Sequence, residues 1–419
     1  MIYLSSEAKY RYRYGISDDA SGFSESLKGW IIMEKLNLSE APIFILPYDG
    51  DCVNERDGIL ADNGIIIPVK VMAPQDGEIY VNGKKAMQKD GVFYCDINIC
   101  DRRTTLTAVD KTRRLITEIV VYYLNEATGK FRLSSDDNIL FLKDLNDNKD
   151  RYKSIFENDY LSVYKKAHDL YGAKVHLNLF YELDGEAAAR FSPEPEYFNL
   201  SMMTDKFKDE FTANSDWLKL AFHSRCELPD KPYLNGTAEE IRRDCIAVNR
   251  EIIRFAGKSC LSDATTTHWG SANLACVRAL RGLGYRALTG YFENRGGEFI
   301  VSYYVPDELC GHIGERDFYY DKKEDVFFGR IDLVLNENCF KQMTEKLQAV
   351  VENPQRGGFV SIMIHEQYFY PSYNNYLPDF TERVLYACKY LYEKGYAGAH
   401  ICDITSEKHL RDNEAFAEK

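Results

Sequence analysis

Short runs in which apolar and polar residues alternate dominate residues 65–130. Alternation with a period of two places the apolar side chains on one face of a strand. Turn residues separate five such runs, at 65–71, 78–81, 91–99, 104–109 and 116–124. The pair Asn82-Gly83 is a strong hairpin signal because both central residues of that turn accept a positive φ. The pattern predicts an N-terminal antiparallel β-sandwich over residues 65–130, preceded by a polar, irregular segment at 1–64.

From residue 131 the pattern changes to apolar runs that alternate with helical periodicity. Strands are expected at 139–142, 174–181, 217–222, 286–292, 359–364 and 397–404, and helices at 159–171, 272–283 and 379–393. Thr237-Ala-Glu-Glu240 is a capping box that opens a further helix. Strands that alternate with helices form right-handed βαβ units with a parallel sheet. We therefore expect an α/β fold over residues 131–419, a deformed (β/α) barrel of about seven strands.

Composition and charge exclude several classes of partner. A formal net charge of −13 argues against nucleic acid or an anionic membrane as the main partner. No apolar run approaches the length that spans a bilayer. The 11 cysteines contain no CxxC pair and mostly lie in apolar runs, which is typical of free thiols in a reducing compartment. We therefore expect a soluble, cytoplasmic protein.

Acids and imidazoles follow several of the predicted strands. Ligands of parallel α/β folds bind at the carboxyl ends of the strands, so these side chains are candidates for one shared site. Three of the eight histidines occupy such positions. The candidates are Asp144, Asp147, His223, Glu227, Asp263, His268, His365 and Glu366. Their convergence predicts a metal site or an acid–base pair.

Each candidate also has a structural interpretation. A histidine at a strand end can cap a neighbouring loop, and His268, beside a tryptophan, can be a buried imidazole bonded to the backbone. Glu227 can be an ordinary exposed loop residue. The aromatic residues Trp269, Tyr368 and Tyr370 can form the floor of a sugar subsite or simply pack at the rim of the barrel.

The order and spacing of these residues resemble the polysaccharide deacetylase superfamily, which includes chitin, chitooligosaccharide and peptidoglycan deacetylases, over residues 136–404. The first motif of that family is a strand that ends in two aspartates, and Leu-Lys-Asp at 142–144 falls there. Its second motif is His-Ser with another histidine four positions after the first, and His223-Ser-Arg-Cys-Glu227 falls there. The turn at 266–270 and the segment at 363–365, with Lys-Gly-Tyr at 394–396, resemble its later motifs.

The resemblance implies metal-assisted hydrolysis of an acyl group on a glycan. Asp144 and His223 would bind a divalent metal, with zinc the leading candidate, and Glu227 or His268 would complete the ligand set. His365 would be the general acid, and Asp147 or Asp263 would supply the general base. The expected partner is a carbohydrate substrate.

Two departures from the family keep other functions open. The position of the general base is Lys143, a cation that cannot activate a metal-bound water, so a glycan-binding protein without turnover is the second hypothesis. The third is a glycosidase on the same scaffold that uses a pair drawn from Glu227, Asp263 and Glu366.

Overall fold

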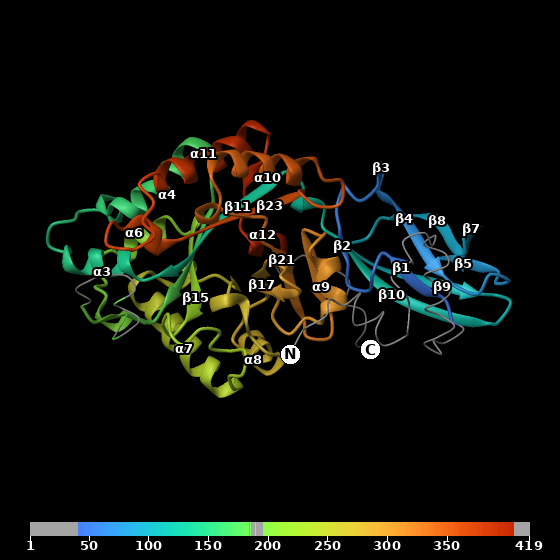
Figure 1. Cartoon of the computed structure of the whole chain (residues 1–419), viewed down its shortest axis with the longest axis horizontal. Coiled ribbons are helices and arrows are strands. Elements are labelled where there is room, and N and C mark those ends of the chain that lie inside the picture. Colours follow the sequence, from blue (N-terminus) through green and yellow to red (C-terminus); the bar gives the residue numbers. More distant parts are fainter. Residues whose placement is uncertain (1–40, 184, 186–188, 190–195, 406–419) are drawn as a thin grey trace.

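The computed structural model describes residues 41–183, 185, 189 and 196–405. These residues form an elongated molecule, with strands β1–β10 at one end and a larger α/β body at the other (Figure 1). The chain enters the α/β body at β11 (Lys130–Asn138). Residues 1–40, which belong to the segment predicted to be irregular, lie outside the described residues.

Two five-stranded sheets make up the N-terminal part. One has the order β1-β4-β8-β7, with β3 also paired to β4, and the other has the order β2-β10-β9-β5-β6. Their inner faces bury one shared apolar cluster because the strands alternate between buried and exposed residues. The strands are β1 (Ile43–Leu46), β2 (Cys52–Val53), β3 (Ile59–Ala61), β4 (Gly64–Met72), β5 (Ile79–Val81), β6 (Lys84–Lys85), β7 (Met87–Lys89), β8 (Val92–Ile99), β9 (Arg103–Asp110) and β10 (Leu115–Tyr123).

Three of these strands come earlier in the chain than the alternation indicated. β1, β2 and β3 lie before residue 65, where the sequence predicts irregular structure, yet each pairs with a strand of the two sheets. They are two to four residues long, too short for a period of two to stand out. The predicted turn between β5 and β6 is confirmed, since Asn82 and Gly83 have φ values of 47° and 80°.

Parallel strands form the centre of the α/β body. One sheet has the order β15-β12-β11-β23-β22, with β24 also paired to β11, and all of its ladders are parallel. A second sheet has the order β16-β17-β21-β20, in which only β20 is antiparallel. Their bounds are β12 (Val175–Phe180), β15 (Leu218–Ser224), β16 (Ala264–Thr265), β17 (Ala287–Gly290), β20 (Phe318–Asp321), β21 (Val326–Arg330), β22 (Leu333–Val334), β23 (Phe359–His365) and β24 (Ala397–Gly398).

The two sheets adjoin at two seams. An isolated parallel bridge joins Leu220 to Leu261 on one side. On the other side the chain itself passes from β21 of the second sheet to β22 of the first, and Asp332, between them, donates its N–H to Ser361 O of β23 at 2.8 Å. The described strands therefore surround an interior without forming a continuous hydrogen-bonded cylinder. The α/β architecture with parallel strands is confirmed; of the deformed barrel expected from the sequence, the described strands form two sheets that do not close into one hydrogen-bonded barrel.

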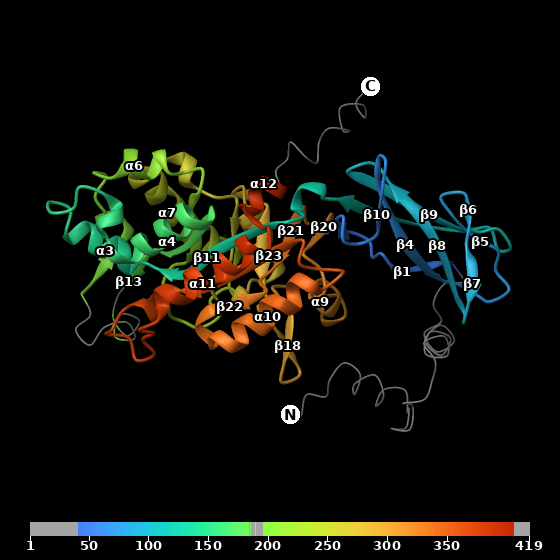
Figure 2. The ribbon, with the colours of Figure 1, turned by 90° about the horizontal axis from the view of Figure 1, so that it is seen from above.

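Helices cover both sides of these sheets. α4, α10 and α11 lie on one side and α7 and α8 on the other, and Figure 2 shows the same body seen from above. The helices are α3 (Leu140–Asp147), α4 (Asp159–Tyr171), α6 (Lys208–Ala213), α7 (Ala238–Phe255), α8 (Leu274–Gly282), α9 (Asp307–Ile313), α10 (Phe340–Glu352), α11 (Phe380–Glu393) and α12 (Ile401–Thr405). The capping box predicted at Thr237 is present at the start of α7. Among the described residues, no helix combines the length and apolar character needed to cross a membrane.

Short elements connect these helices and strands. Two small hairpins are formed by β13 (Glu182–Leu183) with β14 (Phe198–Asn199), and by β18 (Glu293–Arg295) with β19 (Glu298–Ile300). The 3₁₀ turns are η2 (Asn125–Ala127), η3 (Ile155–Glu157), η4 (Leu200–Met202), η5 (Lys258–Cys260), η6 (His268–Gly270), η7 (Leu335–Glu337) and η8 (Glu366–Phe369).

Two predicted strands were wrong. Residues 139–142 belong largely to helix α3, because a short apolar run is equally compatible with a buried helix and a buried strand. Residues 397–404 contain only the two-residue strand β24 before helix α12 begins at Ile401. The first of these errors led to the prediction of Asp144 as a metal ligand, because Asp144 follows residues 139–142.

Strand β11 is buried on both faces and has a different character on each. Phe131 and Leu133 belong to the main apolar cluster, whereas Arg132, Ser134 and Asp136 alternate with them and are also buried. Residues two apart share one face of a strand, so β11 presents an apolar face to the helices and a polar face to the interior. The candidate functional site lies at the carboxyl end of β11, next to this polar face.

Candidate metal centre

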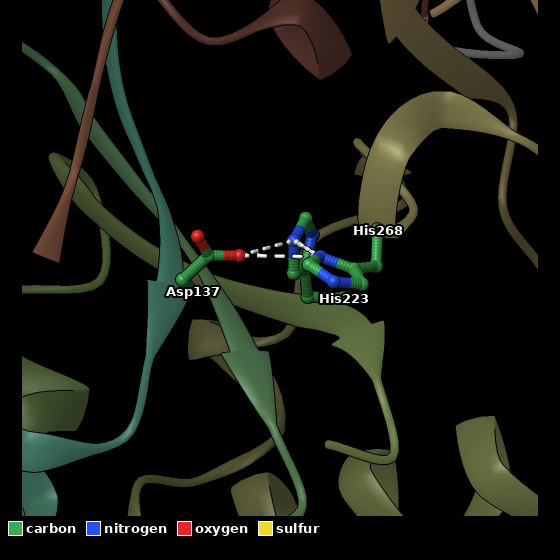
Figure 3. Close-up of side chains that lie close together, drawn as sticks. All are labelled: Asp137, His223 and His268. Atoms are coloured by element: carbon green, nitrogen blue, oxygen red, sulfur yellow. Dashed lines mark hydrogen bonds and ion pairs between the residues drawn. The ribbon is translucent and has the colours of Figure 1, made fainter. Parts of the chain in front are cut away.

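Three side chains from distant parts of the chain meet at the carboxyl ends of the parallel strands. Asp137 lies near the end of β11, His223 near the end of β15 and His268 in the turn η6. Asp137 Oδ1 lies 3.0 Å from His223 Nε2 and 3.3 Å from His268 Nδ1, and the two nitrogens are 3.2 Å apart (Figure 3). Within the described residues this is the one group of three acidic, cysteine or histidine side chains that could hold a metal ion.

A distortion of β11 brings Asp137 into this cluster. Adjacent residues of a regular strand point to opposite faces. Here the ladder between β11 and β12 shifts register between Ser135 and Asn138, and Asp137 has a φ of 61°. Such irregularities redirect a side chain, and both Asp136 and Asp137 consequently line the same pocket.

Hydrogen bonds to the outer nitrogens orient both imidazoles. His223 Nδ1 lies 2.5 Å from Thr266 O, and His268 Nε2 lies 3.0 Å from Glu227 O. A backbone carbonyl only accepts, so each of these nitrogens carries the proton when the ring is neutral. The lone pairs of the inner nitrogens, His223 Nε2 and His268 Nδ1, then face Asp137. Metal-binding histidines are commonly held in this way by their second nitrogen.

The dimensions of the cluster fit a transition metal. Zinc–nitrogen bonds of 2.0–2.1 Å place the donors of a tetrahedral site about 3.3 Å apart, and the three separations here are 3.0, 3.2 and 3.3 Å. Two imidazoles and one carboxylate also form the ligand set of catalytic zinc sites that leave a fourth position open. Without a cation or a shared proton, three electron-rich atoms would face one another. The residues present therefore fit a divalent metal ion.

The side chains of the cluster shift one another's pKa values toward the charged forms. Burial acts to raise the pKa of Asp137, but hydrogen bonds from His223 and His268 and the charge of His365 hold it well below its usual value. Burial acts to lower the pKa of His223, yet the hydrogen bond to Asp137 and the charges of Asp136 and Asp137 raise it above its usual value. Asp137 is therefore a carboxylate at neutral pH, as metal binding requires, and a bound cation would take the place of the proton between His223 Nε2 and Asp137.

Two amide side chains hold the aspartates in place. Gln367 Nε2 donates to Asp137 Oδ2 at 2.8 Å, which leaves Oδ1 for the cluster. Asn178 Nδ2 donates to Asp136 Oδ1 at 2.6 Å. Both aspartates are almost fully buried, at 3% and 5% exposure, and such fixed second partners limit the movement of a ligand or a catalytic base.

The cluster forms one wall of a pocket of about 510 Å³. Aromatic side chains contribute much of its surface, and Trp269, at 47% exposure, is the most accessible of the large apolar ones. His365, at the end of β23, also lines the pocket and is the register neighbour of Asp136. His365 Nδ1 lies 2.9 Å from Asn336 Oδ1, so Nε2 is the nitrogen left for a ligand. The other aromatic residues of the lining are Tyr291, Phe299, Tyr303, Tyr368 and Tyr373.

Left-handed backbone shapes the turn that carries His268. Trp269 and Gly270 have φ values of 61° and 52°, and Val301, which packs against them, has a φ of 49°. A Cβ on Gly270 would lie 2.3 Å from Val301 Cγ1, and Tyr303 N–H donates to Gly270 O at 2.9 Å. Non-glycine residues in this region are uncommon, and they cluster at ligand sites where the surroundings hold them.

The first predicted ligand lies elsewhere. Asp144 is in helix α3, where its carboxylate accepts hydrogen bonds from Asn148, Tyr152 and Asn158, so it is replaced in the cluster by Asp137. Asp147 and Lys143 form an ion pair at 2.5 Å on the same helix, and neither lines the pocket. Lys143, which falls at the motif position of the general base, is therefore not beside the cluster.

Glu227 is near the cluster but enters it through its backbone. Its carbonyl oxygen accepts from His268, whereas its carboxylate Oε2 lies 3.9 Å from His268 Nε2. Glu227 is not among the three residues of the metal group, although it lines the pocket. Asp263 precedes β16, which places it at the opposite, amino end of that strand and outside the pocket lining.

Glu366 has a structural role that the sequence did not suggest. Its two carboxylate oxygens accept from the backbone N–H groups of Ile139, Leu140 and Phe141 at 2.5–2.9 Å, at the start of α3. Burial raises its pKa to about 7, against the hydrogen bonds that favour the carboxylate. Tyr370 donates its hydroxyl to Glu366 at 3.0 Å and lies outside the pocket lining, unlike Trp269 and Tyr368.

Sequence reasoning missed Asp136, Asp137 and Gln367. The signal for the two aspartates was present, since the resemblance requires a strand that ends in Asp-Asp and Ser134-Ser-Asp-Asp137 has this form. The polar residues of β11 hide this strand, because the segment has no apolar run, and the predicted strand was placed at 139–142 instead. Nothing in the sequence singles out Gln367.

Comparisons with known proteins give weak likenesses. Neither a family model nor a curated protein matches the chain. A peptidoglycan N-acetylglucosamine deacetylase structure is 11% identical, with a TM-score of 0.32, and the match covers 66% of this chain and 88% of that one. The catalytic domain of an endo-β-1,4-mannanase of family GH26 from Bacillus sp. JAMB-750 is 13% identical, with a TM-score of 0.26, covering 67% and 81%.

A putative α-galactosidase from Bacteroides fragilis NCTC 9343 is 9% identical, with a TM-score of 0.24, and the match covers 86% of this chain and 81% of that one. The structures similar to this chain thus include a deacetylase and glycosidases. With TM-scores this low, they carry no argument about function.

Proposed function

We propose that the protein is a metal-dependent hydrolase that removes an acyl group from a carbohydrate, with Asp137, His223 and His268 as the metal ligands. The observation that carries this proposal is the convergence of three donor atoms within 3.0–3.3 Å, each fixed by a second hydrogen bond on its far side. A divalent cation held there would act as a Lewis acid toward an acyl oxygen and a water molecule.

The side chains around the cluster supply the acid–base groups. Asp136 lines the pocket beside the ligand Asp137, and since Asn178 occupies its Oδ1, Oδ2 is the oxygen left to take a proton from the attacking water. His365 Nδ1 is bonded to Asn336, so its Nε2 would donate the proton to the leaving amine or alkoxide. Asp136 thus takes the role for which Asp147 and Asp263 were candidates.

The aromatic lining supports a carbohydrate as the substrate. Trp269 and Tyr368 present ring surface to the pocket, and such faces pack against the C–H groups of sugar rings while polar groups at the rim hydrogen-bond the hydroxyls. Both were predicted as substrate-binding residues, and that role stays part of the proposal.

The two alternative functions lose their main support. Binding without turnover was favoured by Lys143 at the base position, and Lys143 instead pairs with Asp147 and Glu196. The glycosidase hypothesis needs a pair of acids in one cleft. Of the three acids named for that pair, Glu227, Asp263 and Glu366, only Glu227 lines the pocket, so a glycosidase would have to use other acids of the lining, such as Glu298 or Glu337.

Metal content tests the proposal before any substrate is known. Wild-type protein loaded with zinc and desalted should retain about one ion per chain by mass spectrometry. His223→Ala and His268→Ala should each weaken binding by at least about 100-fold, since even a change in the residues behind a ligand costs 10- to 100-fold. His168→Ala is the matched control, because His168 lies outside the cluster and stacks on Trp217.

Activity then separates ligands from acid–base groups. Acetate release from N-acetylglucosamine oligomers should fall by about 10²- to 10⁴-fold in Asp136→Asn and in His365→Ala, with zinc content unchanged. The proposal fails if wild-type protein retains no metal, or if His223→Ala and His268→Ala bind zinc as well as His168→Ala does.

A further inference from the structure

A second set of polar side chains lies inside the α/β body, below the metal centre. Arg132 is on the inward face of β11, at 1% exposure. Within the described part of the chain, none of its three guanidinium nitrogens has a hydrogen-bond partner. A buried charge without a partner is strongly unfavourable, so a group that compensates Arg132 is expected.

Three more polar side chains without full hydrogen bonding surround Arg132. Ser361 is its register partner on β23, and its hydroxyl has no partner in the described structure. His176 is the register partner of Ser134, two residues along the same face, and its Nε2 is unpaired as well. Both ring nitrogens of His400 are in the same state, and His400 follows β24, which pairs with β11 beside Arg132.

These four residues, the Arg132 cluster, are neighbours by strand pairing, and the charge of Arg132 acts on both histidines. Together they carry one positive charge. Exposure is 2% or less for each of them. Burial lowers the pKa of Arg132 to about 10, so it remains a cation at neutral pH. Burial and then the charge of Arg132 lower the pKa of His176. For His400, burial, against the charge of Asp403 and with those of Lys174, Lys219 and Arg132, lowers the pKa to about 3, so both rings are neutral.

The cluster is separate from the metal centre. The charge of Asp136 is the one that acts most strongly on Arg132, but no hydrogen bond joins the two side chains. Asp136 Oδ1 instead accepts from Asn178, and Asp136 lines the pocket of the metal centre. At 3.3 Å per strand residue, the Cα atoms of Arg132 and Asp137 are about 16 Å apart. The Arg132 cluster therefore needs a counter-charge of its own.

We infer that the Arg132 cluster binds a small monovalent inorganic anion of the halide class inside the parallel sheets. A guanidinium only donates, a serine hydroxyl can donate, and each neutral imidazole has one N–H to offer. The cluster therefore offers mainly donors, buried and without partners in the described structure. Water could fill hydrogen bonds there, but only an anion also neutralises the charge of Arg132.

Bromide tests this inference because it substitutes for chloride and scatters anomalously. Crystals of the full chain soaked in sodium bromide should show an anomalous peak in contact with Arg132 and Ser361. In solution, the Tm should be higher in bromide or chloride than in gluconate at equal ionic strength. The expected shift is about 2 °C at a halide concentration roughly ten times the Kd.

Variants assign the effect to the cluster. Arg132→Met keeps the length of the side chain and should abolish the difference between halide and gluconate, whereas Arg242→Met, at an exposed position of α7, should preserve it. Ser361→Ala should weaken halide binding several-fold and serves if Arg132→Met does not fold. Bromide-soaked wild-type crystals with only water at Arg132, or equal Tm values in halide and gluconate, would overturn the inference.

Discussion

Gly270 offers a sharp test of how the metal centre is held in place. It lies two residues after His268, has a φ of 52°, and lacks the Cβ that would lie 2.3 Å from Val301 Cγ1 and 3.0 Å from Val301 Cα. Gly270→Ala therefore combines two costs: left-handed backbone for a residue with a Cβ, and a collision with a neighbour that cannot easily retreat, because Val301 is itself left-handed.

The magnitude follows from these two costs. Left-handed backbone costs a non-glycine residue about 1–2 kcal/mol, and forcing an extra methyl group into a packed site costs about 1–3 kcal/mol more. We expect Gly270→Ala to lower the free energy of unfolding by about 3 kcal/mol. Zinc affinity should fall as well, because the turn that holds His268 has to move away from Val301.

Two control variants separate the two costs. Gly172→Ala, at the C-cap of α4, has a φ of 65° with nothing within 4 Å of the added Cβ, so it should cost only about 1 kcal/mol. Gly282→Ala, at the last residue of α8, meets no neighbour and lies in helical backbone, so it should be neutral or slightly stabilising.

Urea unfolding and zinc titration of the four proteins measure these effects. The reasoning is refuted if Gly270→Ala is no less stable than Gly172→Ala, or if it loses stability and still binds zinc with wild-type affinity. The second result would mean that the turn absorbs the collision without moving His268.

Two further predictions concern buried carboxylates. Glu366→Ala should lower the free energy of unfolding by about 3 kcal/mol or more, since it leaves three backbone N–H groups at the start of α3 without an acceptor. Zinc content per folded chain should not change. A variant that is stable but inactive would instead indicate a catalytic role for Glu366. Burial and the charge of Asp332 raise the pKa of Asp317 to about 7. The folded state therefore binds more protons than the unfolded state between about pH 4 and 7. The free energy of unfolding consequently falls as the pH rises through this range, by up to about 1.4 kcal/mol per pH unit. Urea unfolding as a function of pH should show a smaller slope in Asp317→Asn than in wild type, and equal slopes would contradict this assignment.

The sequence predicted those parts of the fold in which one local pattern has one structural solution. The alternating runs at 91–99 and 116–124 became β8 and β10 because one face of each strand meets an apolar core. Thr237 and Glu240 specify the start of α7 through contacts three residues apart. In both cases the local pattern alone is enough to indicate the element.

The candidate site was harder to predict because its strand does not look like a strand. β11 has Arg132, Ser134 and Asp136 on its inward face, so it lacks an apolar run, whereas the apolar residues 139–142 after it fit a short buried strand. β12 and β23 pair with β11 on either side, so β11 is a central strand whose polar face lies inside the protein, and a local pattern of residues does not show this long-range placement. The register shift that turns Asp137 into the pocket likewise depends on β12, and no local pattern encodes it.

One difference in the proposed ligand set explains why the resemblance at His223 was only partial: the second imidazole comes from His268 and not from residue 227. In the motif it resembles, a second histidine follows four residues later, and here that position is Glu227. Glu227 still serves the proposed site, since its backbone carbonyl accepts from His268 Nε2 and thereby directs Nδ1 toward Asp137. Because a backbone carbonyl needs no particular side chain, the proposed metal centre depends on the path of this loop and on the turn at Gly270 more than on the identity of residue 227. Glu227→Gln should therefore leave zinc binding nearly unchanged, whereas displacing the turn should not.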